Sequence, residues 1–219
     1  MQNKSIDTSE VKFFERIQSL VNSEPVVLSK NLTRICAVDA AYSDKDRKVV
    51  AAAALYDNGV LSETSVYSGR FTFPYHTGLF FLHEGPFVVA AVNKLKVKPQ
   101  LACFDAQGIA HPRSKGLATI CGMVLEIPSI GIAKTALIGK ALQYKDGLGK
   151  LNYKGRHVGF ITLDSAKKKL FWSPGYSISL EQLERTIALH QEICLNASRE
   201  AHRLSKIEIL RVKTKPNLQ

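Results

Sequence analysis

Apolar residues near the start of the chain recur at the spacing of a helix. Phe13, Ile17 and Leu20 fall on one stripe, and Ser9 is a candidate capping residue. This pattern predicts an amphipathic helix over 9–21.

The next part of the chain has the pattern of strands. Three largely apolar segments, 34–42, 48–57 and 60–69, follow one another with short polar breaks. The second break contains Asn58 and Gly59, a pair that suits the positive φ angles of a tight hairpin. We therefore expect three consecutive antiparallel strands.

Helical and strand patterns alternate in the second half. We expect a helix that starts near Pro86, since a proline favours the first turn. The other expected elements are a buried strand at 99–105, a helix at 114–127, strands at 129–134, 157–164 and 168–174, and C-terminal helices at 180–195 and 197–210. This order predicts an α/β domain, a mixed sheet with helices on both faces.

Length and composition favour one soluble domain. The chain has 219 residues, of which 45% are hydrophobic, and no linker-like segment divides it. We expect a single domain over 1–219. Apolar stretches such as 49–56 are too short to span a bilayer, and residues 1–10 lack the apolar core of a signal peptide. We expect a cytoplasmic protein that makes no membrane contact.

Charge points to a polyanionic partner. The formal net charge is +11, and the segment 106–163 carries eight Lys or Arg against two acids. Such a field favours nucleic acid, although a basic surface that only aids solubility stays open as an alternative. The four cysteines form no C-x-x-C pair, so neither a zinc site nor a disulfide is expected.

Three acids interrupt apolar runs. Asp39 lies within a strand pattern, Asp105 ends another, and Glu84 stands in an apolar helix pattern. A buried charge needs a partner or a metal, and converging carboxylates suit Mg²⁺. Each acid also fits a salt bridge or a cap, and Glu84 fits the start of the helix expected at Pro86. His202 is a candidate proton-transfer group or a surface histidine.

The motifs around these acids resemble the Endonuclease V family. The segments "AVDAAY", "FTFPYHTGLFFLHEGP", "FDAQGIAHPRSKGLA", "EIPSIGIAKTAL" and "SPGYSIS" carry the resemblance, in the family's order and with similar spacing. It implies a ribonuclease H-like fold. It also implies cleavage of DNA on the 3′ side of deoxyinosine, which contains the deaminated adenine hypoxanthine, in DNA repair.

The resemblance assigns roles at the catalytic centre. Asp39 and Asp105 match the ligands of Mg²⁺, for which Mn²⁺ can substitute, and Glu84 matches a third active-site carboxylate. Lys134 matches a lysine beside the scissile phosphate, and His202 matches a histidine near the metal.

The resemblance also assigns residues to base recognition. Tyr75 corresponds to an aromatic wedge that fills the gap left by an extruded base. The residues expected to surround that base are Gly78, Phe80, Gly108, His111 and Gly116. The family's Pro-Tyr-Ile-Pro-Gly stands here with His76 and Thr77 at its third and fourth positions, and its Asp-Gly-Gln-Gly has Ala106 second.

Two other functions remain open from sequence. Inosine in RNA is an alternative substrate, because contacts to the 2′-hydroxyl are not visible in a sequence. A nucleic-acid-binding module without catalysis is the other, although the three carboxylates and Lys134 argue against it. We expect the protein to act as a monomer.

Overall fold

The computed structural model describes residues 8–21, 24–26, 28, 29, 31–73, 75–145 and 147–214. Helix α1 (Thr8–Leu20) opens the described part, and the strands β1 (Arg34–Ser43), β2 (Lys48–Asp57) and β3 (Val60–Arg70) follow. The three strands are antiparallel neighbours, as predicted. Asn58 and Gly59 have φ angles of 49° and 80°, which confirms the tight hairpin.

The remaining elements complete one mixed sheet. They are α2 (Phe80–Asn93), β4 (Leu101–Phe104), α3 (Leu117–Leu125), β5 (Ser129–Ala133), β6 (Lys140–Lys145), β7 (Leu148–Tyr153), β8 (Arg156–Leu163), β9 (Lys169–Pro174) and α4 (Leu180–Thr214). The nine strands lie in the order β3-β2-β1-β4-β5-β9-β8-β7-β6. Strands β1, β4 and β5 are parallel neighbours, so their carboxyl ends meet at one edge of the sheet.

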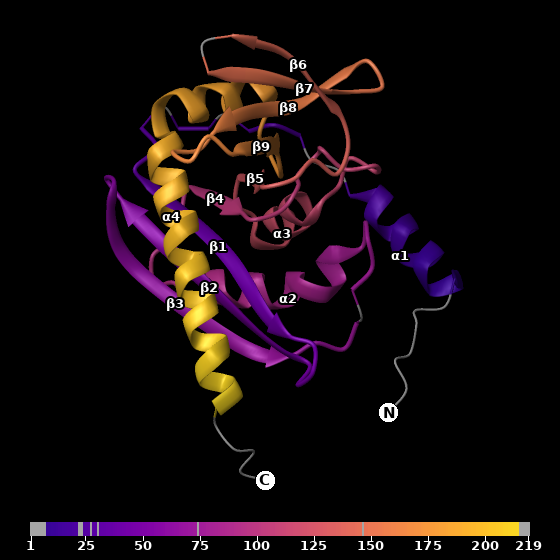
Figure 1. Ribbon diagram of the computed structural model, residues 1–219, viewed down its shortest axis with the longest axis vertical. Coiled ribbons are helices and arrows are strands. Elements are labelled where there is room, and N and C mark those ends of the chain that lie inside the picture. Colours follow the sequence, from indigo (N-terminus) through magenta and orange to yellow (C-terminus); the bar gives the residue numbers. More distant parts are fainter. Residues whose placement is uncertain are drawn as a thin grey trace.

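Helices cover both faces of this sheet, as the sequence predicted. On one face, α2 and α3 bury residues such as Val88 and Cys121 against Val38 of β1. On the other face, α4 buries Leu183 and Cys194 in a cluster with Trp172. Figure 1 shows the long α4 lying across β1 and β2, with α2 on the opposite side of the sheet.

Helix α1 differs from its predicted role as an ordinary amphipathic helix. It begins at Thr8, so Ser9 lies in the first turn rather than at the cap. Phe13, Ile17 and Leu20 are exposed, whereas the polar Gln18 is its buried residue. The helix therefore packs on the rest of the protein through a polar side chain, whereas its apolar stripe predicted packing through hydrophobic side chains.

The predicted start of α2 at Pro86 is wrong. The helix begins at Phe80 and contains Pro86. Pro86 is exposed, so water can replace the hydrogen bond that the ring removes, while His83, Glu84 and Val88 are buried. The buried residues on either side of the proline keep the helix continuous.

The C-terminal helices were wrongly divided. A single helix, α4, runs through Asn196, whose side-chain oxygen accepts a hydrogen bond of 2.7 Å from Arg199. Cys194 and Ala197 are fully buried on either side of Asn196. Burial of both residues favours continuing the helix, and no glycine or proline in this stretch breaks it.

Strands β6 and β7 were not predicted. Their pairing shifts register between Leu142 and Tyr144, which disturbs the two-residue period that a sequence pattern relies on. All four cysteines are buried and free, as expected. Among the helices described here, none has the length and apolar character needed to cross a membrane.

Candidate functional site

Two carboxylates and an imidazole converge at the carboxyl edge of the parallel strands. Val38 of β1 pairs with Phe104 of β4, so the next residues, Asp39 and Asp105, lie side by side. His202 of α4 approaches from the face of the sheet that α4 covers. One ligand atom from each of the three lies within 4.8 Å of the others. The spacing and the carboxylate–imidazole chemistry fit a metal ion.

Asp39 is held from α4 by two hydrogen bonds. Its Oδ2 lies 2.8 Å from Nδ1 of His202 and accepts a bond of 3.1 Å from the Ser205 hydroxyl. Burial raises the pKa of Asp39 above its usual value and the charge of Asp105 raises it further, while the bond from His202 opposes both effects. A cation at this position would offset the repulsion between the carboxylates.

Glu84 lies deep in α2 on the other side of β1. Burial raises its pKa well above the usual value, and the negative charges of Asp39 and Asp105 add to the rise. The helix begins four residues earlier, so Glu84 does not stabilise a helix start at Pro86. It lies outside the group of Asp39, Asp105 and His202. Its electrostatic coupling to both aspartates places it beside the site.

Lys134 follows β5 and pairs with Asp105. The distance from its Nζ to Oδ2 of Asp105 is 2.5 Å. Burial lowers the pKa of Lys134, but the hydrogen bond and charge of Asp105 outweigh burial and raise it. The side chain is 64% exposed, so the ammonium group is accessible from solvent. It is a positive charge fixed at the rim of the acidic group.

A cavity of about 300 Å³ opens beside Asp105 and Lys134. Its lining includes most of the residues predicted to surround a base, namely Tyr75, Gly78, Phe80, His111 and Gly116. Gly108 is not part of this lining. Its amide donates to the Ser173 hydroxyl at 2.8 Å, and a Cβ there would come within 1.9 Å of the Pro174 carbonyl oxygen. Gly108 thus allows its loop to pack on β9.

The Tyr75 ring stands at the cavity largely in solvent, with 62% of the residue exposed. It makes edge-on contacts with Phe80 at 5.5 Å and His83 at 6.4 Å between ring centroids. Sequence reasoning missed His83. This buried residue also contacts Tyr42, and its Nδ1 lies 2.7 Å from the Phe73 carbonyl oxygen. Its spacing of three from Phe80 in a helix was the available signal.

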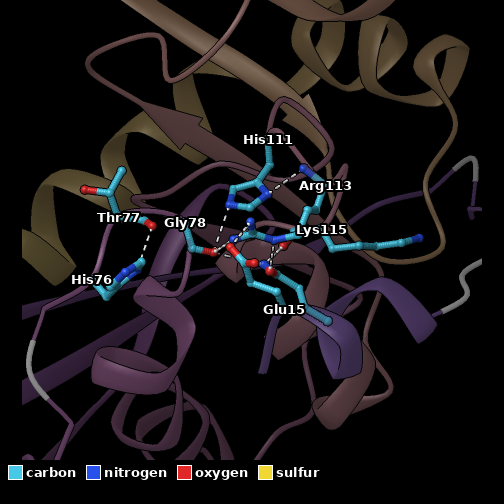
Figure 2. Close-up of polar contacts among 8 residues, drawn as sticks. Glu15, His76, Thr77, Gly78, His111, Arg113 and Lys115 are labelled. Atoms are coloured by element: carbon cyan, nitrogen blue, oxygen red, sulfur yellow. Dashed lines mark hydrogen bonds and ion pairs between the residues drawn. The ribbon is translucent and has the colours of Figure 1, made fainter. Parts of the chain in front are cut away.

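The carbonyl oxygen of Gly78 joins the loop after Tyr75 to the loop that carries His111 and Arg113. Nε2 of His111 lies 3.1 Å away and the Arg113 guanidinium 2.7 Å away (Figure 2). The Arg113 amide donates to Nδ1 of His111, so the proton of the neutral ring lies on Nε2. Burial, then the charge of Arg113, lower the pKa of His111 to about 4, although the Gly78 bond opposes them.

Two of the three departures from the family pattern lie at this cavity. Thr77 and Ala106 both line it, and His76 is partly buried, with Nδ1 2.9 Å from the Thr77 carbonyl oxygen. Ala106 is absent from the positive-φ residues of the described chain, so the methyl group causes no backbone strain. Pro74, which precedes the wedge, lies outside the described residues.

A second hollow, of about 180 Å³, lies on the other side of Asp105 and Lys134. It is lined by residues of α4, including Ser198, Arg199 and His202. The acidic group therefore borders two hollows that share Asp105 and Lys134.

The Endonuclease V family model matches residues 15–202. The chain belongs to the Endonuclease V family. It is 38% identical over 156 residues to Endonuclease V of Dictyoglomus turgidum, a match that covers 69% of this chain and 68% of that protein. Membership confirms the family resemblance found in the sequence motifs.

Solved Endonuclease V structures share the whole fold. That of Streptomyces avermitilis superposes with a TM-score of 0.82 at 26% identity, over 97% of each chain. That of Ciona intestinalis, in complex with a 24mer DNA containing an inosine followed by a ribo-adenosine, has a TM-score of 0.77 at 16% identity, over 94% of this chain and 100% of that chain. The Endonuclease V fold of this chain is ribonuclease H-like, as the motifs implied.

Proposed function

We propose that this protein is a Mg²⁺-dependent endonuclease that recognises hypoxanthine in DNA and hydrolyses a phosphodiester on its 3′ side, leaving a 3′-hydroxyl and a 5′-phosphate. The observation that carries the proposal is the convergence of Asp39, Asp105 and His202 beside a cavity with Tyr75 at its edge. Family membership supports nuclease chemistry. The inosine-containing DNA bound to the Ciona protein supports the substrate class.

Asp39 and Asp105 are the residues that would hold the Mg²⁺, and Mn²⁺ would fit the same oxygen ligands. When bound, such an ion activates water and stabilises the leaving oxygen of a phosphodiester. The buried Glu84 is coupled electrostatically to both aspartates, which raise its pKa, so a cation bound beside them would favour its ionised form.

His202 and Lys134 contact different aspartates of this centre. His202 orients Asp39 through its 2.8 Å bond, and its ring offers a site for a proton during the reaction. Lys134 is a compact charge that neutralises the oxyanion developing on the phosphate. Its present partner is Asp105, so phosphate binding would draw the ammonium group toward the substrate.

The cavity is suited to hold an extruded base. Its volume of about 300 Å³ lies at the lower end of ligand pockets, which suits one planar ring system. The exposed Tyr75 ring is free to stack in the gap that the base leaves, which partly offsets the cost of extrusion. Main-chain groups of Gly78 lie in the lining, where an N–H donor favours the O6 atom of hypoxanthine over the amino group of adenine.

The direct test uses matched strands. Inosine- and adenine-containing DNA and RNA are incubated with Mg²⁺ and separately with EDTA, and the product ends are identified. We expect the inosine-containing DNA to be cleaved in the presence of Mg²⁺ and to stay intact in EDTA. Preferred cleavage of inosine in RNA would move the proposal to that substrate, and binding without cleavage would replace it with a non-catalytic module.

A further inference from the structure

Gln18 occupies an unusual place in α1. The apolar residues Phe13, Ile17 and Leu20 of this helix are exposed, yet Gln18 is only 1% exposed and lines the cavity. Burying a polar amide costs free energy unless its donors and acceptor are satisfied. The helix must therefore gain from the contacts that this one side chain makes.

The Gln18 amide ties two loops of the cavity together. Its Nε2 donates to the carbonyl oxygen of Gly78 at 3.2 Å and also to that of Lys115. Gly78 belongs to the loop that follows Tyr75, and Lys115 directly precedes Gly116. Both glycines line the cavity. One amide thus sets the separation of the two loops at this end of the cavity.

Arg113 and Glu15 complete the connection to α1. Oε1 of Gln18 accepts a bond of 2.5 Å from Nε of Arg113, and Glu15 pairs with Nη1 of the same guanidinium at 2.6 Å. Figure 2 shows the Glu15, Arg113 and His111 side chains converging on Gly78. We call Glu15, Gln18 and Arg113 the α1 clamp.

The clamp holds a turn that has little rigidity of its own. The Leu79 amide donates to the His76 carbonyl oxygen at 3.0 Å, and Gly78 has a φ of 84° at the third position of the turn. Thr77 stands where the family pattern has a proline, so no ring restricts φ in this turn. Side chains that bind the Gly78 carbonyl oxygen supply the restraint instead.

We propose that Gln18 is a positioning residue for base discrimination, which acts by holding the Gly78 and Lys115 carbonyl groups at a fixed separation. The proposal rests on the proposed function, because it concerns the same cavity. Gln18 lies on a different element from Asp39, Asp105 and Lys134, so its loss should affect recognition of the base more than hydrolysis.

The test compares Gln18→Ala and Gln18→Glu with Ser19→Ala. Ser19 is an exposed neighbour whose hydroxyl bonds the Arg16 carbonyl oxygen, so it controls for changes to α1 itself. Gln18→Glu keeps the size of the side chain and the acceptor for Arg113 but, when ionised at pH 8, has no donor for the two carbonyl groups. Affinity for inosine and adenine strands is measured in EDTA, and the single-turnover rate at saturating inosine strand is measured with Mg²⁺.

We expect both Gln18 variants to lose affinity for the inosine strand by about five- to hundredfold, because the Lys115 carbonyl group loses its bond from Gln18 and Gly78 is held by His111 and Arg113 alone. Affinity for the adenine strand and the saturating rate should change much less. Ser19→Ala should match the parent. A residue that only stabilises the fold would lower the melting temperature and reduce binding to both strands equally.

Two results would overturn the inference while the proposed function stands. One is a Gln18→Ala variant that discriminates between the strands as the parent does. The other is a Gln18→Glu variant with parental discrimination, which would show that recognition of the base does not need the Gln18 donor. If Gln18→Ala fails to fold, Glu15→Ala takes its place. We expect this variant to lose less of its discrimination between the two strands. Discrimination equal to that of the parent would again contradict the inference. A parent that binds both strands equally overturns the proposed function and this inference together.

Discussion

Nδ1 of His202 lies 2.8 Å from Oδ2 of Asp39, although 163 positions separate the two residues in the sequence. Ser205, one turn further along α4, donates to the same oxygen at 3.1 Å. The long C-terminal helix thus carries two side chains that orient the carboxylate of a central strand. This contact makes α4 part of the proposed catalytic centre.

The first prediction concerns these two contacts. His202→Ala should lower the single-turnover rate by about 10²- to 10⁴-fold, the usual contribution of a proton-transfer group, whereas Ser205→Ala should have a smaller effect because it removes orientation alone. A double-mutant cycle measures the coupling between them. Equal losses in the two single variants would contradict a proton-transfer role for His202.

Removing either aspartate should abolish cleavage and leave the fold intact. Asp39→Ala and Asp105→Asn each remove a carboxylate that is proposed to hold the metal, whose contribution is typically several kcal/mol of barrier. The melting temperature of Asp39→Ala should not fall sharply, since burial and the charge of Asp105 already raise the pKa of Asp39 and so disfavour its ionised form. The exposed Asp44→Asn is the matched control. Turnover like that of the parent in Asp39→Ala would rule out the metal site.

Tyr75 should contribute stacking to binding but little to stability. Tyr75→Ala should weaken binding of inosine strands by about 1 to 3 kcal/mol, or tenfold to a hundredfold, and Tyr75→Phe should retain most of the affinity. Because the residue is 62% exposed, the melting temperature of the Ala variant should stay close to that of the parent. An early-melting Ala variant with unchanged discrimination would show that Tyr75 packs the loop and is not a wedge.

Binding to duplex DNA should weaken steeply with salt. Each phosphate that is neutralised contributes about 0.9 to the slope of log affinity against log salt. Lys150 and Lys154, on and beside β7, are exposed members of the basic segment. Lys150→Gln and Lys154→Gln should each reduce the slope by about 0.9 if they contact phosphate. Slopes unchanged in both variants would place the nucleic acid on another surface.

His111 should make stability depend on pH in the acid range. The pKa of His111 is lowered to about 4 in the folded protein, by burial and then by Arg113, from a usual value near 6.5. The unfolded chain then binds the proton first, so the stability from neutral His111 is complete above about pH 6.5 and is lost as pH falls toward 4. His111→Asn should remove this component. Denaturant melts at pH 7 and 5 measure it, and an equal pH dependence in the two proteins would contradict the lowered pKa.

The sequence was sufficient to predict those elements whose apolar pattern agreed with turn residues or isolated charges nearby in the chain. The largely apolar segments with short polar breaks predicted β1 to β3, and Asn58-Gly59 predicted the hairpin between β2 and β3, because both signals act between near neighbours. The isolated acids Asp39 and Asp105 stood out because a charge in an apolar run needs a compensating partner. The motifs around them identified the family and the ribonuclease H-like fold.

Other features depended on contacts between distant segments. Helix α2 runs through Pro86 and α4 continues past Asn196 because residues on both sides of each are buried. Strands β6 and β7 pair with shifts of register that blur their period. In each case, packing against the rest of the fold outweighed the local preference.

The residue types of the candidate site could therefore be predicted from the sequence, whereas the contacts that bring them together could not. Residue types, their interruption of apolar runs and their motifs pointed to Asp39, Glu84, Asp105, Lys134 and His202. Nothing in the local pattern of α1 shows that Gln18 is buried or that it reaches Gly78, because that burial is compensated by two carbonyl groups and a guanidinium group 60, 97 and 95 positions away. The tertiary structure alone satisfies those groups, and so it alone decides which polar residue becomes part of the cavity.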